Sequence, residues 1–132
     1  LFTFYPSQSM ERFDILISPK YSVKDDLLTA ILLVHEISHV RDFVNDQKDG
    51  EPTGCFETEG IAFSAQNYFA SLLNEEEVNS INARVRTNLS REAQQVVDVF
   101  TVVPKYPGDN YYEKSLNFVK ASPFYKEHCK QR

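Results

Sequence analysis

Residues 27–44 read LLTAILLVHEISHVRDFV, and the pattern HExxH stands at residues 35–39. Apolar residues recur here at three- and four-residue steps, which predicts an amphipathic helix from about Val23 to Val44. His35 and His39 fall on the apolar face of this helix, one turn apart, so both imidazoles can reach one metal ion. Imidazoles that point into an apolar core are costly unless their nitrogens are satisfied, and burial therefore favours metal binding over a surface role.

Glu36 stands beside the first His of the pattern. On a helix with two metal-binding His four residues apart, a Glu at this position faces the water on the metal. We therefore expect Zn²⁺ as the metal and Glu36 as the general base that acts on the water. A helix with two surface His is the alternative.

A second helix is predicted over Cys55 to Leu73, after a polar loop at residues 45–54 that contains two Gly and one Pro. Glu57 and Glu59 lie about 200° apart around this helix, so only one of them can face the His pair. We select Glu59. The same helical face contains Ala62, Ala65 or Gln66, and Phe69, and its small alanines would let another helix approach closely.

HEISH on one helix, followed twenty residues later by Glu59 within the sequence EGIA on a second helix, resembles the zincin metallopeptidases, specifically the gluzincin arrangement. The resemblance implies that His35, His39 and Glu59 hold Zn²⁺ and leave the fourth position to water. Glu36 would then take a proton from that water as it attacks a peptide carbonyl, and would pass it to the leaving amine. The family also implies an edge strand for an extended peptide substrate, and Phe13–Ile17 is the candidate.

The chain departs from the gluzincin pattern in its outer hydrogen-bonding groups. No Asp follows Glu59 closely, where many gluzincins carry the carboxylate that orients the first His. Asp42 lies one turn beyond His39 and is a candidate partner for an imidazole, although we favour a carboxylate that faces solvent. Tyr112 and His128 are candidates for binding the oxyanion, although each is more ordinarily a half-buried ring or a surface imidazole.

A metzincin is excluded because Asp42 and Asn45 stand where that group needs a Gly and a third ligand. The single Met, Met10, lies upstream of the pattern and cannot form the downstream Met turn. The remaining alternative is a degenerate zincin fold that binds zinc or a protein without hydrolysis. It is motivated by the missing Asp and by the short chain.

Cys55 and Cys129 are the two cysteines of the chain. They can form one disulfide that closes a long loop, they can be free thiols, or Cys55 can bind the metal. A disulfide would imply an oxidising compartment, and hence an extracytoplasmic or secreted protein. Because the chain begins at Leu1 without Met and shows no leader, we expect a mature or shortened form.

The composition is that of one folded domain spanning residues 1–132, with 42% hydrophobic residues. A net charge of −5 with scattered Lys and Arg argues against nucleic acid as a partner. No apolar stretch is long enough for a membrane span. We expect a monomer that acts on a peptide or protein substrate.

The fold class predicted is α+β and mostly helical: a zincin-like small domain with an N-terminal hairpin or small sheet. The sheet is predicted from residues 1–5 and 13–17. Ser22 and Asp25 resemble a cap for the first helix. The later elements are a helix capped by Asn74 and Glu77 that reaches Leu89, a helix from Ser90 through Val103, and a loop over residues 104–110. The last two are a helix containing Leu116, Phe118 and Val119, and a short helix capped by Ser122 that begins at Pro123.

Overall fold

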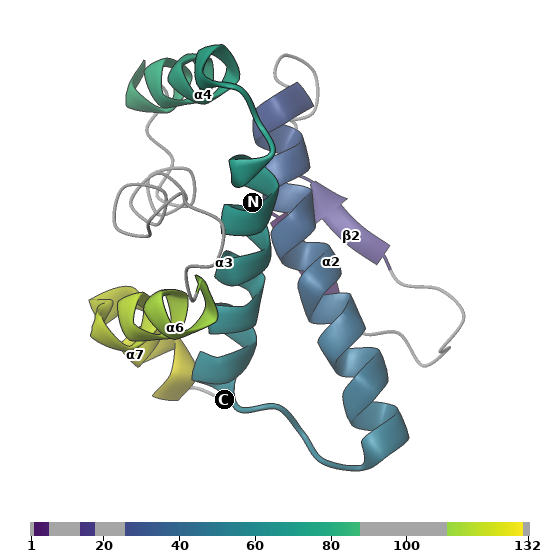
Figure 1. Cartoon of the computed structure of the whole chain (residues 1–132). Helices are drawn as coiled ribbons and strands as arrows, with labels where there is room; N and C mark the ends of the chain where they lie inside the picture. The colour runs from purple at the N-terminus through teal and green to yellow at the C-terminus, as the bar shows by residue number, and fades with distance from the viewer. Residues whose placement is uncertain (1, 6–13, 18–25, 88–110, 131–132) are drawn as a thin grey trace.

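The computed structural model describes residues 2–5, 14–17, 26–87 and 111–130, and the described protein is mostly helical with one small sheet (Figure 1). This architecture confirms the predicted α+β, mostly helical class. The described helices are α2 (Asp26–Asp49), α3 (Cys55–Ser71), α4 (Glu75–Thr87), α6 (Tyr111–Ala121) and α7 (Pro123–Lys130). None of them combines the length and apolar character that a membrane crossing requires.

The sheet has two antiparallel strands, β1 (Phe2–Tyr5) and β2 (Asp14–Ile17). Phe2 pairs with Ile17 and Tyr5 pairs with Asp14. The predicted N-terminal sheet is therefore confirmed for these eight residues. β1 packs against α2, whereas the strand that we singled out for substrate, β2, is paired with β1. Phe13 lies outside the described residues.

The long helix α2 carries the HExxH pattern and extends to Asp49, beyond the end predicted at Val44. The residues after Val44 are polar and mostly exposed, and a polar sequence can continue the exposed end of a helix. Gly50 ends the helix with a φ of 72°, a backbone conformation that glycine adopts without steric cost. The side chain of Asp46 then fixes the loop by accepting hydrogen bonds from Thr53 N and Oγ1 at 2.9 and 2.7 Å.

The described core lies where α3 packs against α2 on one side and against α6 on the other (Figure 1). Every described helix contributes at least one buried apolar side chain. The buried residues are Leu28, Ile31 and Leu32 of α2, Phe63 of α3, Ile81 of α4, Val119 of α6 and Tyr125 of α7. The prediction of a core-facing α2 is thus confirmed, because its apolar face is the face that enters this cluster.

Two predicted helix starts are observed. Glu77 N donates to Asn74 Oδ1 at 2.8 Å and Asn74 N donates to Glu77 Oε1 at 3.0 Å, which is a reciprocal capping box at the start of α4. α7 begins at Pro123 as predicted. The predicted cap at Ser22 and Asp25, the end at Leu89, the helix from Ser90 to Val103 and the loop over 104–110 lie outside the described residues.

Gly60 allows the close approach of α3 to α6. A Cβ atom at this position would stand 3.2 Å from Leu116 Cα, which is backbone and cannot rotate away. We expect Gly60→Val to lower the free energy of unfolding by about 1–3 kcal/mol, because overpacking outweighs the few tenths of a kcal/mol that Val gains in helix propensity. Thermal or urea unfolding measures this change. Tyr68→Val on the exposed face of α3 is the control, and an equal loss in both variants would contradict the packing explanation.

Candidate metal site

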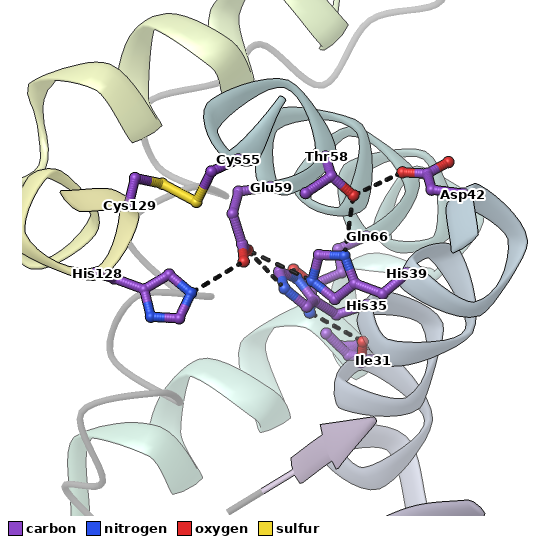
Figure 2. A network of polar contacts seen from close by, with 10 residues as sticks. All are labelled: Ile31, His35, His39, Asp42, Cys55, Thr58, Glu59, Gln66, His128 and Cys129. Carbon is purple, nitrogen blue, oxygen red and sulfur yellow. Dashed lines mark hydrogen bonds and ion pairs between the residues drawn. A yellow bond between two sulfur atoms is a disulfide. The ribbon is translucent and has the colours of Figure 1, made fainter. Parts of the chain in front are cut away.

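His35 and His39 of α2 and Glu59 of α3 point toward one another (Figure 2). Their ligand atoms all lie within 4.8 Å of one another. Glu59 Oε2 lies 3.0 Å from His35 Nε2 and 3.5 Å from His39 Nε2. Ligands held at 2.0–2.2 Å around a tetrahedral ion are separated by about 3.4 Å, and both distances from Glu59 to the imidazoles are close to this value. The structure brings together the three residues that the sequence analysis selected as ligands.

Helix geometry and packing place these ligands. The four-residue spacing puts both imidazoles on the face of α2 that meets α3. The His35 ring lies edge-on to His39 and to Phe63, with ring centroids 4.7 and 4.8 Å apart. Ala62, one turn beyond Glu59, is fully buried, and its small side chain allows the two helices to lie close together. The ligands are therefore held by the packed core.

A hydrogen-bond chain determines the tautomer of His35. Gln66 Nε2 donates to Ile31 O at 2.9 Å, which orients the Gln66 amide so that Oε1 faces His35. His35 Nδ1 lies 3.1 Å from that oxygen. Because Oε1 can only accept, Nδ1 is the donor, and Nε2 of neutral His35 keeps its lone pair toward Glu59 and His39.

A second series of hydrogen bonds determines the tautomer of His39. Thr58 Oγ1 donates to Asp42 Oδ2 at 2.7 Å, so its oxygen accepts from His39 Nδ1 at 3.2 Å. The Nε2 lone pair of neutral His39 is therefore also directed at the common point (Figure 2). This arrangement of both imidazoles, with Nδ1 engaged and Nε2 available, suits metal ligation.

The expectation that Asp42 faces solvent is wrong. Asp42 is 8% exposed, and it is held by Thr58 and by Arg41, whose Nε lies 3.8 Å from Asp42 Oδ1. The packing of α3 over α2 covers this carboxylate, and helix spacing within α2 alone did not reveal that cover. Asp42 therefore acts on His39 through Thr58 and makes no direct bond to an imidazole in the described structure.

Gln66 orients His35. The gluzincin resemblance had led us to look for an Asp in this role. Gln66 lies seven residues beyond Glu59, two turns along the same face of α3. The sequence contained this signal, because Gln66 was placed on the Glu59 face. The sequence analysis gave no role to Thr58, because it assigned the functional role in this turn to the adjacent Glu59. Only the contact between α3 and α2 shows the role of Thr58.

The charge of Glu59 and the charges of the two imidazoles influence one another. Burial favours the neutral form of Glu59. Hydrogen bonds that His35 and His39 donate through Nε2 when the rings are protonated, together with the positive charges of those rings, outweigh burial, and the pKa of Glu59 falls far below its usual range. Burial likewise lowers the pKa of His35, but the hydrogen bond and negative charge of Glu59, with a contribution from Glu36, raise it above 6.5. A carboxylate that stays ionised between two imidazoles is a suitable place for a cation.

The other candidate residues differ in position. Glu36 follows His35 on α2, is half-buried, and is close enough for its charge to act on that imidazole. His128 of α7 places Nε2 3.9 Å from Glu59 Oε1. Tyr112 is exposed on α6 and, within the described part of the chain, makes no polar contact with the cluster.

Cys55 and Cys129 form a disulfide with a Cα–Cα distance of 5.6 Å, so neither the free-thiol nor the metal-ligand alternative holds for Cys55.

Comparison of the chain with protein-family models, with curated proteins and with solved structures finds no match. The site is therefore interpreted from its own geometry. That geometry shows two imidazoles and one carboxylate that can hold a metal ion. The Cys55–Cys129 disulfide is compatible with an oxidising compartment, where disulfides persist.

Thr58→Val tests the chain of hydrogen bonds behind His39. We expect metal affinity to fall by about 10- to 100-fold, because loss of such an orienting partner frees the imidazole and its tautomer. Titration with Zn²⁺ in competition with a chromophoric chelator measures the change. Thr58→Ser keeps the hydroxyl and is the control; an affinity equally reduced in Ser and Val would contradict the role of the hydroxyl.

The raised pKa of His35 predicts how metal binding depends on pH. A proton on His35 must leave before Nε2 can bind a metal, so affinity falls as the pH falls through the pKa. Because that pKa lies above 6.5, the loss begins above the pH expected for an ordinary imidazole. The dissociation constant for Zn²⁺ measured at intervals between about pH 5 and 8 checks this. An affinity independent of pH over this interval would rule out His35 as a ligand.

Proposed function

We propose that the protein is a zinc-dependent metallopeptidase with the gluzincin arrangement of ligands. The observation that carries the proposal is the convergence of His35 Nε2, His39 Nε2 and Glu59 Oε2, with each Nδ1 engaged by an orienting partner. Two imidazoles and one carboxylate form a ligand set typical of catalytic zinc, which is completed by water. The resemblance of HEISH and Glu59 to the zincins supports the same conclusion.

Glu36 is the proposed general base. Zn²⁺ held by His35, His39 and Glu59 would polarise a peptide carbonyl and would make water acidic enough to be deprotonated near neutral pH. Glu36 stands next to His35 on α2, is half-buried, and is close enough for its charge to act on the His35 imidazole. In the proposed reaction Glu36 accepts a proton from the attacking water and passes it to the leaving amine as the peptide bond breaks.

Zinc is the proposed metal because of the chemistry of the donors. Imidazole nitrogen is a good ligand for Zn²⁺, whereas Ca²⁺ and Mg²⁺ prefer sites made of oxygen. Two of the three donors here are imidazole nitrogens. The substrate is a peptide or protein, and the disulfide supports an extracytoplasmic or secreted location.

A zinc-binding domain without hydrolytic activity is the second candidate, and one observation favours it. The ligand side chains are largely covered, with 11%, 16% and 6% of the surface of His35, His39 and Glu59 exposed. Structural zinc sites are closed, whereas catalytic sites keep an open position. Covered ligands are thus compatible with a zinc ion that only stabilises the fold or a protein-binding surface.

Glu36→Gln distinguishes the two functions. We expect the variant to retain zinc and to lose peptide cleavage by about 10²–10⁴-fold, because the amide cannot accept the proton. Zinc content by elemental analysis and cleavage of a broad peptide library are the measurements, and Glu51→Gln in the exposed loop before α3 is the control. A wild-type protein that binds zinc and cleaves no member of the library would establish the second candidate. A wild-type protein without zinc would refute both.

A further inference from the structure

The two carboxylate oxygens of Glu59 face different groups. Oε2 faces the imidazoles of His35 and His39, while Oε1 lies 3.9 Å from Nε2 of His128 (Figure 2). His128 is thus the third imidazole around this carboxylate, and it comes from α7 at the opposite end of the described chain. The proposed function assigns no role to it.

A disulfide lies next to His128. Cys55 precedes Glu59 by four residues, so both lie on one face of α3, one turn apart. Cys129 is adjacent to His128 in the last turn of α7, and it is bonded to Cys55 across 74 residues of sequence. The disulfide therefore joins α7 to α3 one turn from Glu59, and the residue beside it is the imidazole that faces Oε1.

Aromatic packing also contacts α7. Tyr125 is buried, and its ring lies 5.6 Å from that of Phe63. Phe124 stacks on the His128 ring with centroids 6.0 Å apart and planes 8° apart. The last turn ends at an exposed Lys130, and a helix of eight residues is not stable without tertiary contacts. The disulfide is therefore a covalent restraint on the end of α7 that carries His128, in addition to the ring contacts of His128 with Phe124 and Tyr125.

We propose that His128 is a positioning residue for Glu59, and that the Cys55–Cys129 disulfide holds it there, so that metal affinity depends on this disulfide. The inference rests on the metal site of the proposed function and is independent of peptidase activity. An imidazole that carries a hydrogen on Nε2 donates to Oε1 once the side chains approach by about 1 Å from their present 3.9 Å. With Oε1 engaged in this way, Glu59 presents Oε2 alone to the metal. Groups that hydrogen-bond to a ligating carboxylate tune metal affinity.

The test measures Zn²⁺ affinity by chelator competition for the oxidised wild type, His128→Leu and His128→Gln. We expect His128→Leu to weaken binding by about 10- to 100-fold, and His128→Gln to recover part of the loss because its amide can donate to Oε1. The absorption spectrum of bound Co²⁺ is a second measurement, and it should change in His128→Leu as the coordination of Glu59 changes. Glu127→Gln, on an exposed position of α7, should leave both measurements unchanged.

The disulfide is tested by the pair Cys55→Ser and Cys129→Ser, alone and combined with His128→Leu. We expect the Ser pair to weaken Zn²⁺ binding, and His128→Leu to add little to that loss, because both changes remove the same contact. Thermal unfolding of each variant without metal reports its folding. If the Ser pair does not fold, oxidised His128→Leu and His128→Gln, which both keep the disulfide, still test the role of His128 through Zn²⁺ affinity and the Co²⁺ spectrum.

Each outcome separates the two proposals. Absence of Zn²⁺ binding by the wild type would overturn the metal site, and with it this inference. Wild-type binding with an unchanged affinity and Co²⁺ spectrum in His128→Leu would overturn the role of His128 and leave the proposed function intact. Additive losses in the combined variant would overturn the link between the disulfide and His128.

Discussion

The carboxylate of Glu59, buried between two helices, is the constraint on which the described structure depends. A charge taken out of water costs several kcal/mol unless it is paired and hydrogen-bonded. Here Oε2 is shared by His35 and His39, so the cost is offset only when α3 lies against the His-bearing face of α2. Ile31 of α2 and Phe63 of α3 belong to one buried cluster, so that position is compatible with a well-filled core. The core and the site therefore specify one arrangement of the two helices.

The groups behind the imidazoles complete this arrangement. Gln66 connects His35 to the backbone oxygen of Ile31, and Thr58 connects His39 to Asp42. Each connection runs between α2 and α3, so it contributes to the contact between the helices and also selects the imidazole tautomer. Both Nε2 atoms are thereby directed to one point before any metal binds. A preformed site of this kind loses less conformational entropy when it takes up an ion.

Successive turns of α3 make contacts with different helices. Cys55 bonds covalently to α7, and Glu59, one turn later, pairs with α2. Gly60 then allows α6 to approach the same helix. α3 is consequently the element that all other parts of the site contact. A third imidazole, that of His128 beside the disulfide, lies 3.9 Å from its carboxylate. The function proposed for the site and the role proposed for His128 both depend on this convergence.

The amino-acid sequence by itself determined the local features. The four-residue spacing placed His35 and His39 on one face of a helix, helix geometry separated Glu59 from Glu57, and Asn74 and Glu77 specified a helix start, because each of these depends only on residues within a turn or two. The tertiary structure decided what lies opposite each group. It showed that Asp42 is buried under Thr58, that Gln66 rather than an Asp orients His35, that Cys55 pairs with Cys129, and that His128 instead of Tyr112 approaches Glu59. These facts depend on how α3 lies against α2 and α7. That arrangement follows from the packing of the whole core and from the need to pair the buried carboxylate of Glu59, and neither can be read from a local sequence pattern.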